Sequence, residues 1–155
     1  TGDGMLAVFG VPLEQDSQAE AQAAIEAAIE INAGLEQLNK ELLQDKEPEM
    51  RIRMGIHSGE ALVGSMGSTE RIEYAVIGDS VNCASRLESL DKHRHEGLLR
   101  VLISSTTIDL LAADFRSGLE LEFWGPVQVK GREQPLSVSE LRMDNAQGAA
   151  EATQP

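Results

Sequence analysis

Residues 74–86 read YAVIGDSVNCASR, and this stretch contains the change of structure that decides the fold. The apolar run Tyr74–Ile77 predicts a buried strand, which the following Gly-Asp pair ends. Asp79 or Ser80 then serves as the N-cap of a helix that is predicted to continue to about Leu90. A strand followed directly by a short helix indicates a domain that contains both kinds of element.

The predicted helix carries an amide and a guanidinium on one face. Asn82 and Arg86 are four residues apart and therefore project together. Val81, Ala84 and Leu87 form the apolar stripe that is expected to face the core. An amide and a guanidinium on a short capped helix suit a ribose and a phosphate. The alternative is a solvated helix face with Arg86 paired to an acidic neighbour, and spacing alone favours that alternative.

Strand and helix patterns alternate on both sides of this stretch. Met5–Phe9 is an apolar run that predicts a buried strand. Apolar residues at helical spacing from Ser17 to about Leu43 predict a long amphipathic helix. Apolar and polar residues then alternate around paired glycines, which predicts two strands joined by a turn at Ser58–Gly59.

The second half of the chain continues the alternation. A polar loop is predicted at Gly67–Arg71. Later patterns predict a strand at 98–104, a short helix at Ser105–Ala113 and a final antiparallel pair of strands at 119–131 and 136–142. Residues 145–155 contain too few apolar side chains to pack, so we expect a disordered tail. Strands interleaved with helices predict an α+β fold with a mixed or antiparallel sheet.

The composition restricts the class of protein. Among 155 residues, 26 are acidic and 13 are basic, which gives a formal net charge of −13. A field of this sign repels nucleic acid and anionic lipid, although it leaves room for a local basic pocket. Cys83 is the only cysteine, which excludes a disulfide framework and suits a reducing compartment. No apolar run approaches membrane-spanning length, so we expect a soluble, cytoplasmic domain.

Several short segments contain residues that suit phosphate or metal binding. Asp3 lies between two glycines before an apolar run, where a carboxylate could hold Mg²⁺, although four residues alone favour an ordinary turn. Arg51 and Arg53 share one strand face, and an arginine at a strand end can pair with phosphate, but an exposed arginine is more common. Lys130 at a strand end allows the same two interpretations. His57 by itself is more often a structural or surface histidine than a ligand.

The order of these segments is more specific than any one of them. GDGMLAVFG, a long helix, MGIHSGEALVGSMG, EYAVIGDSVNCASRLE and VKG follow one another along the chain. Together they closely resemble the catalytic domain of class III nucleotidyl cyclases, the adenylyl and guanylyl cyclases. The resemblance runs from Gly2 to about Leu141, and GxxVNxASR is its most distinctive part. It implies a ferredoxin-like α/β sandwich core with flanking helices, in a domain that spans residues 1–144.

The resemblance implies a role for individual residues. Asp3 matches the second of two metal-binding aspartates, and Arg53 matches a phosphate-binding arginine of the same protomer. Asn82 and Arg86 match the ribose-orienting and transition-state residues, which come from the partner protomer. Lys130 matches a lysine that contacts the triphosphate. Such an enzyme is a head-to-tail homodimer that uses two Mg²⁺ or Mn²⁺ ions to convert a nucleoside triphosphate into the 3′,5′-cyclic nucleotide and pyrophosphate.

Two parts of the family pattern are expected upstream of Thr1. These are the first metal-binding aspartate and one base-selecting residue, so we expect this chain to belong to a longer protein with regulatory domains and a possible membrane anchor. The other base-selecting position matches Ala75. Alanine there removes an acceptor that adenine needs, which favours GTP slightly and leaves ATP as the alternative.

Other functions are also consistent with parts of the sequence. A degenerate cyclase-like module that only regulates or dimerises is the main alternative to an active cyclase. A diguanylate cyclase needs a GG[DE]EF-type turn, and a P-loop NTPase needs GxxxxGK[ST]; the chain contains neither.

Overall fold

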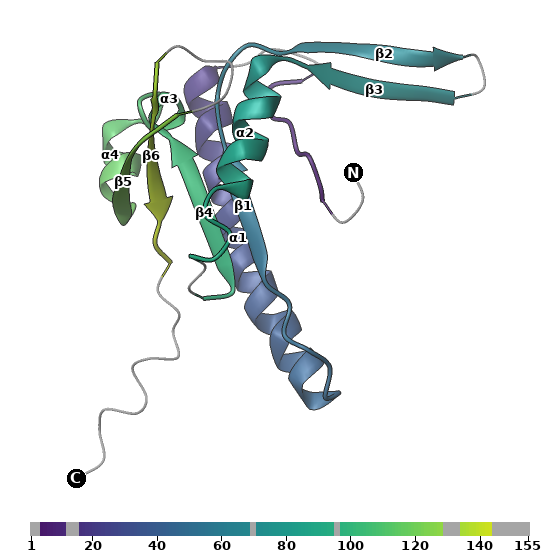
Figure 1. Ribbon diagram of the computed structural model, residues 1–155, viewed down its shortest axis with the longest axis vertical. Helices are drawn as coiled ribbons and strands as arrows, with labels where there is room; N and C mark the ends of the chain where they lie inside the picture. Colours follow the sequence, from purple (N-terminus) through teal and green to yellow (C-terminus); the bar gives the residue numbers. More distant parts are fainter. Residues whose placement is uncertain (1–3, 12–15, 69–70, 95–96, 129–133, 144–155) are drawn as a thin grey trace.

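The computed structural model describes residues 4–11, 16–68, 71–94, 97–128 and 134–143. Among these residues four helices, two of them short, and six strands are arranged as in Figure 1. In chain order they are α1 (Ser17–Gln44), β1 (Ile52–Ile56), β2 (Leu62–Ser68), β3 (Arg71–Ile77), α2 (Asp79–Ser89), β4 (Leu99–Ser104), α3 (Ser105–Ile108), α4 (Ala113–Ser117), β5 (Leu121–Val127) and β6 (Leu136–Leu141).

The main sheet has four strands in the order β1-β4-β6-β5. Strand β1 pairs with β4 in parallel, from Ile52 opposite Leu99 to Ile56 opposite Ile103. Strands β4 and β6, and β6 and β5, are antiparallel. The sheet is therefore mixed, and the predicted α+β fold is confirmed.

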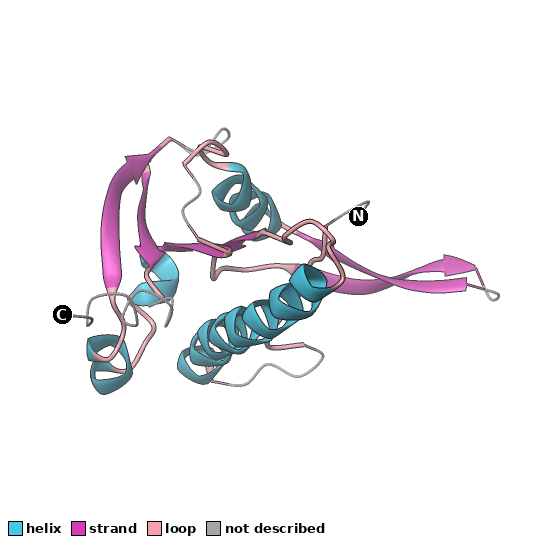
Figure 2. Cartoon of the chain, turned by 90° about the horizontal axis from the view of Figure 1, so that it is seen from below, coloured by secondary structure: helices cyan, strands magenta, loops and turns pink. Residues whose placement is uncertain are grey.

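Helices cover the two faces of this sheet. Every residue of β4 is buried, which requires cover on both sides because strand side chains alternate between faces. Val101 and Ile103 pack in a core cluster with Ile25 of α1, whereas Leu102 packs with Leu87 of α2. In Figure 2 the long helix α1 and the shorter α2 accordingly lie on opposite sides of the strands.

Local sequence explains why both helices form where they do. Helix α1 begins after Asp16, whose carboxylate accepts a hydrogen bond from the amide of Gln18 at 3.2 Å. Its Ala21, Ile25 and other buried residues recur on one face, as predicted. Helix α2 packs so closely on β1 that a Cβ at Gly55 would be only 2.1 Å from the carbonyl oxygen of Ala84. Only glycine permits this approach.

Strands β2 and β3 form a separate two-stranded hairpin that projects from the rest of the molecule (Figure 1). Their register runs from Leu62 opposite Ile77 to Ser68 opposite Arg71. The two strands contact chiefly each other. Leu62 is 79% exposed and Ile77 is 60% exposed. The hairpin thus leaves apolar side chains uncovered by this chain.

Two predictions about strand pairing were wrong. Met5–Phe9 is not a strand: its backbone is irregular and Met5 is 94% exposed, since no described strand pairs with it. The segments flanking Ser58–Gly59 are strands, but they belong to different sheets because β1 takes β4 as its partner. Alternation of side chains predicts a strand without identifying its neighbour.

Three element boundaries also differ from the predictions. The N-cap of α2 is Gly78, not Asp79 or Ser80, and no side chain caps the helix. The predicted polar loop Gly67–Arg71 is shorter, because strand pairing extends to Ser68 and resumes at Arg71. The predicted helix Ser105–Ala113 stops at Ile108. Among the described residues, no helix combines the length and apolar character needed to cross a membrane.

Candidate active site

Helix α2 presents the amide and the guanidinium that its sequence predicted on one face. Cys83 and Leu87 are its fully buried residues, while Val81 and Ala84 are only half-buried, so the predicted apolar stripe is correct at Leu87 and lacks Cys83. Asn82 is exposed and Arg86 is half-buried. The close approach of α2 to β1 fixes the helix that carries both residues to the sheet.

A hydrogen bond also fixes the start of α2. The Ser80 hydroxyl donates to the Glu60 carbonyl oxygen at 2.7 Å. Glu60 lies in the segment between β1 and β2. The helix is therefore connected both to the sheet and to the chain that leads into the hairpin.

Arg86 lines a pocket between the carboxyl end of α2 and the end of β5. The pocket has a volume of about 340 Å³. Its lining consists of Arg86, Leu87, Ser89, Leu90, Asp91, Val127 and Gln128. A guanidinium at the wall of an open pocket suits an anionic ligand, because arginine donates two parallel hydrogen bonds to phosphate. Lys130 follows Gln128 by two residues but lies outside the described residues, as does Asp3.

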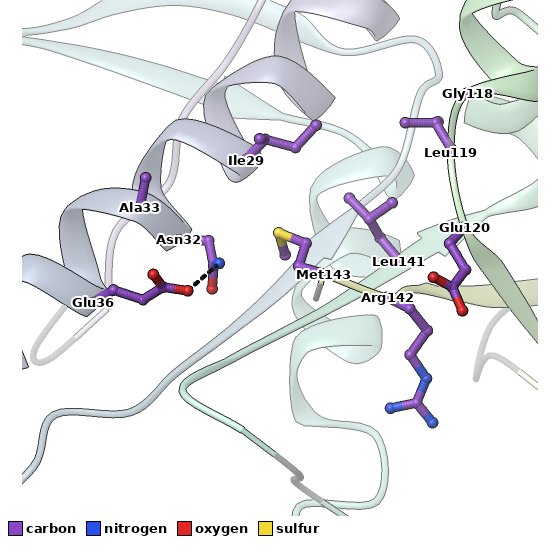
Figure 3. Close-up of a pocket in the computed structure, with 10 residues that line it drawn as sticks. All are labelled: Ile29, Asn32, Ala33, Glu36, Gly118, Leu119, Glu120, Leu141, Arg142 and Met143. Atoms are coloured by element: carbon purple, nitrogen blue, oxygen red, sulfur yellow. Dashed lines mark hydrogen bonds between the residues drawn. The ribbon is translucent and has the colours of Figure 1, made fainter. Parts of the chain in front are cut away.

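A second pocket, of about 320 Å³, lies between α1 and the end of β6 (Figure 3). Asn32 and Glu36 of α1 are on one side, joined by a hydrogen bond from Asn32 Nδ2 to Glu36 Oε1 of 3.2 Å. Leu141 and Met143 are on the other side. None of the described residues that were predicted to bind substrate lines this pocket, whereas Arg86 lines the first one.

Arg53 lies on β1 beneath the same helix. Its Nε donates to Glu88 Oε1 of α2 at 2.9 Å, and each side chain is about one third exposed. A substrate phosphate that binds Arg53 therefore has to share the guanidinium with Glu88 or displace this carboxylate. Arg51, expected on the same strand face, precedes the strand and pairs with Glu49 at 2.7 Å.

Ala75 lies in the middle of β3, opposite Gly64 of β2, and is half-buried. It is four residues before α2 begins, so the hairpin and the helix that carries Asn82 are directly connected. The proposed base-selecting position thus belongs to the projecting hairpin, whereas Asn82 and Arg86 belong to the body.

His57 has a structural role in this fold. Its Nδ1 is 2.9 Å from the Ser104 hydroxyl, and the Ser58 hydroxyl donates to Thr107 Oγ1 at 3.0 Å. Ser104 and Thr107 are fully buried. These hydrogen bonds connect the segment after β1 to the end of β4 and to α3, and the expected structural interpretation of His57 is supported.

One buried arginine, Arg100 on β4, was not among the residues predicted from the sequence; it is 1% exposed. Its guanidinium donates to four backbone carbonyl oxygens in the last turn of α2 and in the turn that follows it, at 2.5–3.1 Å. Burial lowers the pKa of Arg100, as does the nearby charge of Arg53, while Glu140, Asp91 and Glu88 raise it. The sequence signal that could have identified Arg100 is its position as the single charged residue inside the apolar run LLRVLIS.

The described residues do not form a metal site by themselves. Among them, no group of three or more His, Cys, Asp or Glu side chains is placed to hold a metal ion. Glu88 is paired with Arg53, and Asp91 lies on an exposed turn. The metal prediction therefore depends on Asp3, outside the described residues.

Comparison with known proteins gives a consistent family assignment. Residues 1–140 match the family described as the adenylate and guanylate cyclase catalytic domain. The chain is 34% identical to Adenylate cyclase 1 of Rhizobium meliloti (strain 1021) over 140 residues, which is 90% of this chain and 20% of that protein. It is 30% identical to an adenylate cyclase of Anabaena cylindrica over 145 residues, 91% of this chain and 27% of that protein.

Solved structures agree with this match. The crystal structure of the adenylyl cyclase CyaB from P. aeruginosa has a TM-score of 0.72 and 29% identity, covering 89% of this chain and 66% of that one. A guanylyl cyclase structure has a TM-score of 0.70 and 29% identity, covering 96% of this chain and 70% of that one. The chain belongs to the adenylate and guanylate cyclase catalytic domain family. It spans only about a fifth to a quarter of the length of the curated relatives named above.

Proposed function

We propose that residues 1–144 form the catalytic domain of an active purine nucleotidyl cyclase in the cytoplasm. The carrying observation is that Asn82 and Arg86 lie one turn apart on α2, with Arg86 in the wall of a pocket that also reaches the end of β5. This arrangement supports a site for a ribose and its α-phosphate. The single free cysteine, Cys83, is buried and suits a reducing compartment.

The proposed reaction is an intramolecular displacement. The ribose 3′-oxygen forms a bond to the α-phosphorus. At the same time, the bond breaks between that phosphorus and the oxygen that bridges it to the β-phosphorus. The hydroxyl proton passes to solvent, and pyrophosphate leaves with the electron pair of the broken bond. Arg86 stabilises the negative charge that develops on the α-phosphoryl oxygens, where a preorganised positive group acts most strongly. Asn82 both donates to and accepts from the ribose, and so orients the 3′-hydroxyl for attack.

Asp3 and an aspartate upstream of Thr1 are the proposed ligands of divalent metal ions, which when bound would neutralise charge on the triphosphate. The described residues do not form that site. Lys130 is the proposed contact to the triphosphate. A phosphate that binds Arg53 either joins Glu88 on the guanidinium or displaces that carboxylate.

A head-to-tail homodimer is part of the proposal. An isolated two-stranded hairpin is marginally stable in water, and the β2–β3 hairpin exposes Leu62 and Ile77 side by side. A second copy of the chain is the partner that the family assignment favours for this surface. In that dimer, Asp3 of one protomer and Arg86 of the other belong to the same site.

Complementation between inactive variants tests the shared site. We expect Asp3→Ala and Arg86→Ala separately to lower activity by about a hundredfold or more, and their mixture to regain activity because each heterodimer contains one intact site. A tandem fusion of the two variant chains supplies a second format, and a fusion of two Arg86→Ala chains is the matched control. If neither the mixture nor the Asp3→Ala/Arg86→Ala fusion exceeds that control, the shared-site model is wrong.

GTP is the proposed substrate and ATP the alternative. Ala75 can neither accept a hydrogen bond from the adenine amino group nor donate one to guanine O6. Selection therefore depends on the residue expected upstream of Thr1 and on backbone groups. Competition between the two triphosphates on the full-length protein decides the question, and a higher kcat/KM for ATP overturns only the guanylyl assignment.

A further inference from the structure

Arg100 is given no role in the reaction described above. It is buried beneath α2, and its two terminal nitrogens donate to four backbone carbonyl oxygens at and beyond the end of that helix. These acceptors are Glu88 at 3.1 Å, Leu90 at 2.5 Å, Asp91 at 2.6 Å and Arg94 at 2.7 Å. A helix leaves its last carbonyl groups without partners, and one side chain here supplies donors for that end.

Two of the four residues bonded to Arg100 belong to the wall of the Arg86 pocket. Leu90 and Asp91 line that pocket together with Arg86, and each is bonded to Arg100 through its backbone. Asp91 has a φ of 38°, a backbone conformation that non-glycine residues rarely adopt. The turn is therefore held in an unfavourable geometry, and its hydrogen bonds to Arg100 stabilise it.

Arg100 also connects this turn to β5, which forms the opposite wall. Its guanidinium lies 5.6 Å from the centre of the Trp124 ring, and that of Arg94 lies 4.4 Å from it. The ring is fixed in turn, because Trp124 Nε1 donates to Glu140 Oε2 of β6 at 2.9 Å. Val127, three residues beyond Trp124, lines the pocket. One wall of the pocket, the turn after α2, is thus bonded to the Arg100 guanidinium, and the other wall, β5, carries the Trp124 ring beside that guanidinium.

We propose that Arg100 is a positioning residue of the cyclase reaction. It holds the 88–94 turn against β4 and β5, and thereby fixes the orientation in which Arg86 enters the pocket. This inference rests on the proposed function, since it assigns Arg100 a role that acts through Arg86. A residue that only stabilised the fold would lower the amount of folded protein and leave the turnover of folded molecules unchanged.

The test is a double-mutant cycle between the two arginines in the full-length protein. Arg100→Met keeps an unbranched side chain and removes the charge and every donor. We expect kcat per folded molecule to fall about 10- to 100-fold with KM changed less than about 3-fold, because a displaced catalytic group costs rate more than binding. In an Arg86→Ala background the same substitution should change kcat by less than about 3-fold, since its effect passes through Arg86.

Matched variants complete the experiment. Arg116→Met is the control, because Arg116 is half-exposed and pairs only loosely with Asp109 at 3.7 Å; its kcat should equal that of the unmodified protein. Arg100→Lys keeps the charge and part of the donors and should retain a kcat between those of Arg100→Met and the unmodified protein. If Arg100→Met does not fold, the cycle is run with Arg100→Lys.

The outcomes separate this inference from the proposed function. Equal losses of kcat with and without the Arg86→Ala substitution, or an unchanged kcat for both Arg100 variants, overturn the positioning role while cyclase activity stands. An unmodified full-length protein that forms no cyclic nucleotide overturns the proposed function, and the positioning role with it. A kcat loss that disappears in the Arg86→Ala background supports the proposal.

Discussion

The four-stranded sheet and the β2–β3 hairpin are built from similar apolar strands, but only the sheet is covered by helices of its own chain. Leu102 of β4 is fully buried, whereas Leu62 of β2 is 79% exposed. The sheet therefore obtains its stability from within the chain, while the hairpin has to obtain cover from elsewhere. Asn82 and Arg86 belong to the covered region, and Ala75 belongs to the uncovered one. Substitutions in the covered region should consequently alter stability and turnover, whereas substitutions in the hairpin should alter self-association and base preference.

The largest expected effect is on the free energy of unfolding, when each of these two leucines is replaced by alanine. Leu102→Ala should lower the free energy of unfolding by about 3 kcal/mol, because it removes buried methyl groups and leaves a cavity. Leu62→Ala should change it by less than about 0.5 kcal/mol when dilution keeps the protein monomeric. Urea denaturation followed by circular dichroism measures both values. Similar losses for the two variants would contradict the contrast between sheet and hairpin.

The second prediction concerns turnover in the covered region. Arg86→Ala should lower kcat and kcat/KM together by about a hundredfold or more, since Arg86 acts on charge that develops in the transition state. Initial rates of cyclic nucleotide formation, with folding checked by circular dichroism, provide the measurement. Near-normal turnover with only a raised KM would make Arg86 a simple binding residue.

A third prediction addresses what covers the hairpin. Leu62→Asp should weaken self-association by about tenfold or more, because a charge would then be buried in the proposed dimer interface. Leu43→Asp is the matched control: Leu43 is 77% exposed and belongs to the last turn of α1. That end of the helix lies away from the hairpin (Figure 1). Sedimentation equilibrium measures the dissociation constants. Equal constants for both variants would remove the hairpin from the interface.

The smallest expected effect is at Ala75, on the hairpin. Ala75→Thr should raise kcat/KM for ATP by only about 2- to 5-fold, because it adds one acceptor for the adenine amino group and leaves the base-selecting residue expected upstream of Thr1 unchanged. The ratio of kcat/KM for ATP and GTP, measured before and after the substitution, is the readout. A reversal of preference by this single change would show that Ala75 dominates base selection.

Local sequence predicted most elements but not how they pair. The apolar periodicity of α1 and the run LLRVLIS specify a helix and a buried strand, because both patterns repeat over many adjacent residues. The partner of β1 is β4, which lies far along the chain beyond the hairpin and α2, and no local pattern contains that information. Met5–Phe9 shows the same limit: its apolar residues suit a strand, but they remain exposed where no described strand pairs with them.

The candidate site divides in the same way. The sequence by itself determined that Asn82 and Arg86 share one helix face and that the chain belongs with the cyclases, because both depend on residue types at fixed spacing. Only the tertiary structure decided that Arg53 is paired with Glu88 and that Arg100 binds the end of α2. Those contacts join residues on different elements, and they form because the packing of α2 on β1 and β4 buries charges that then require nearby partners.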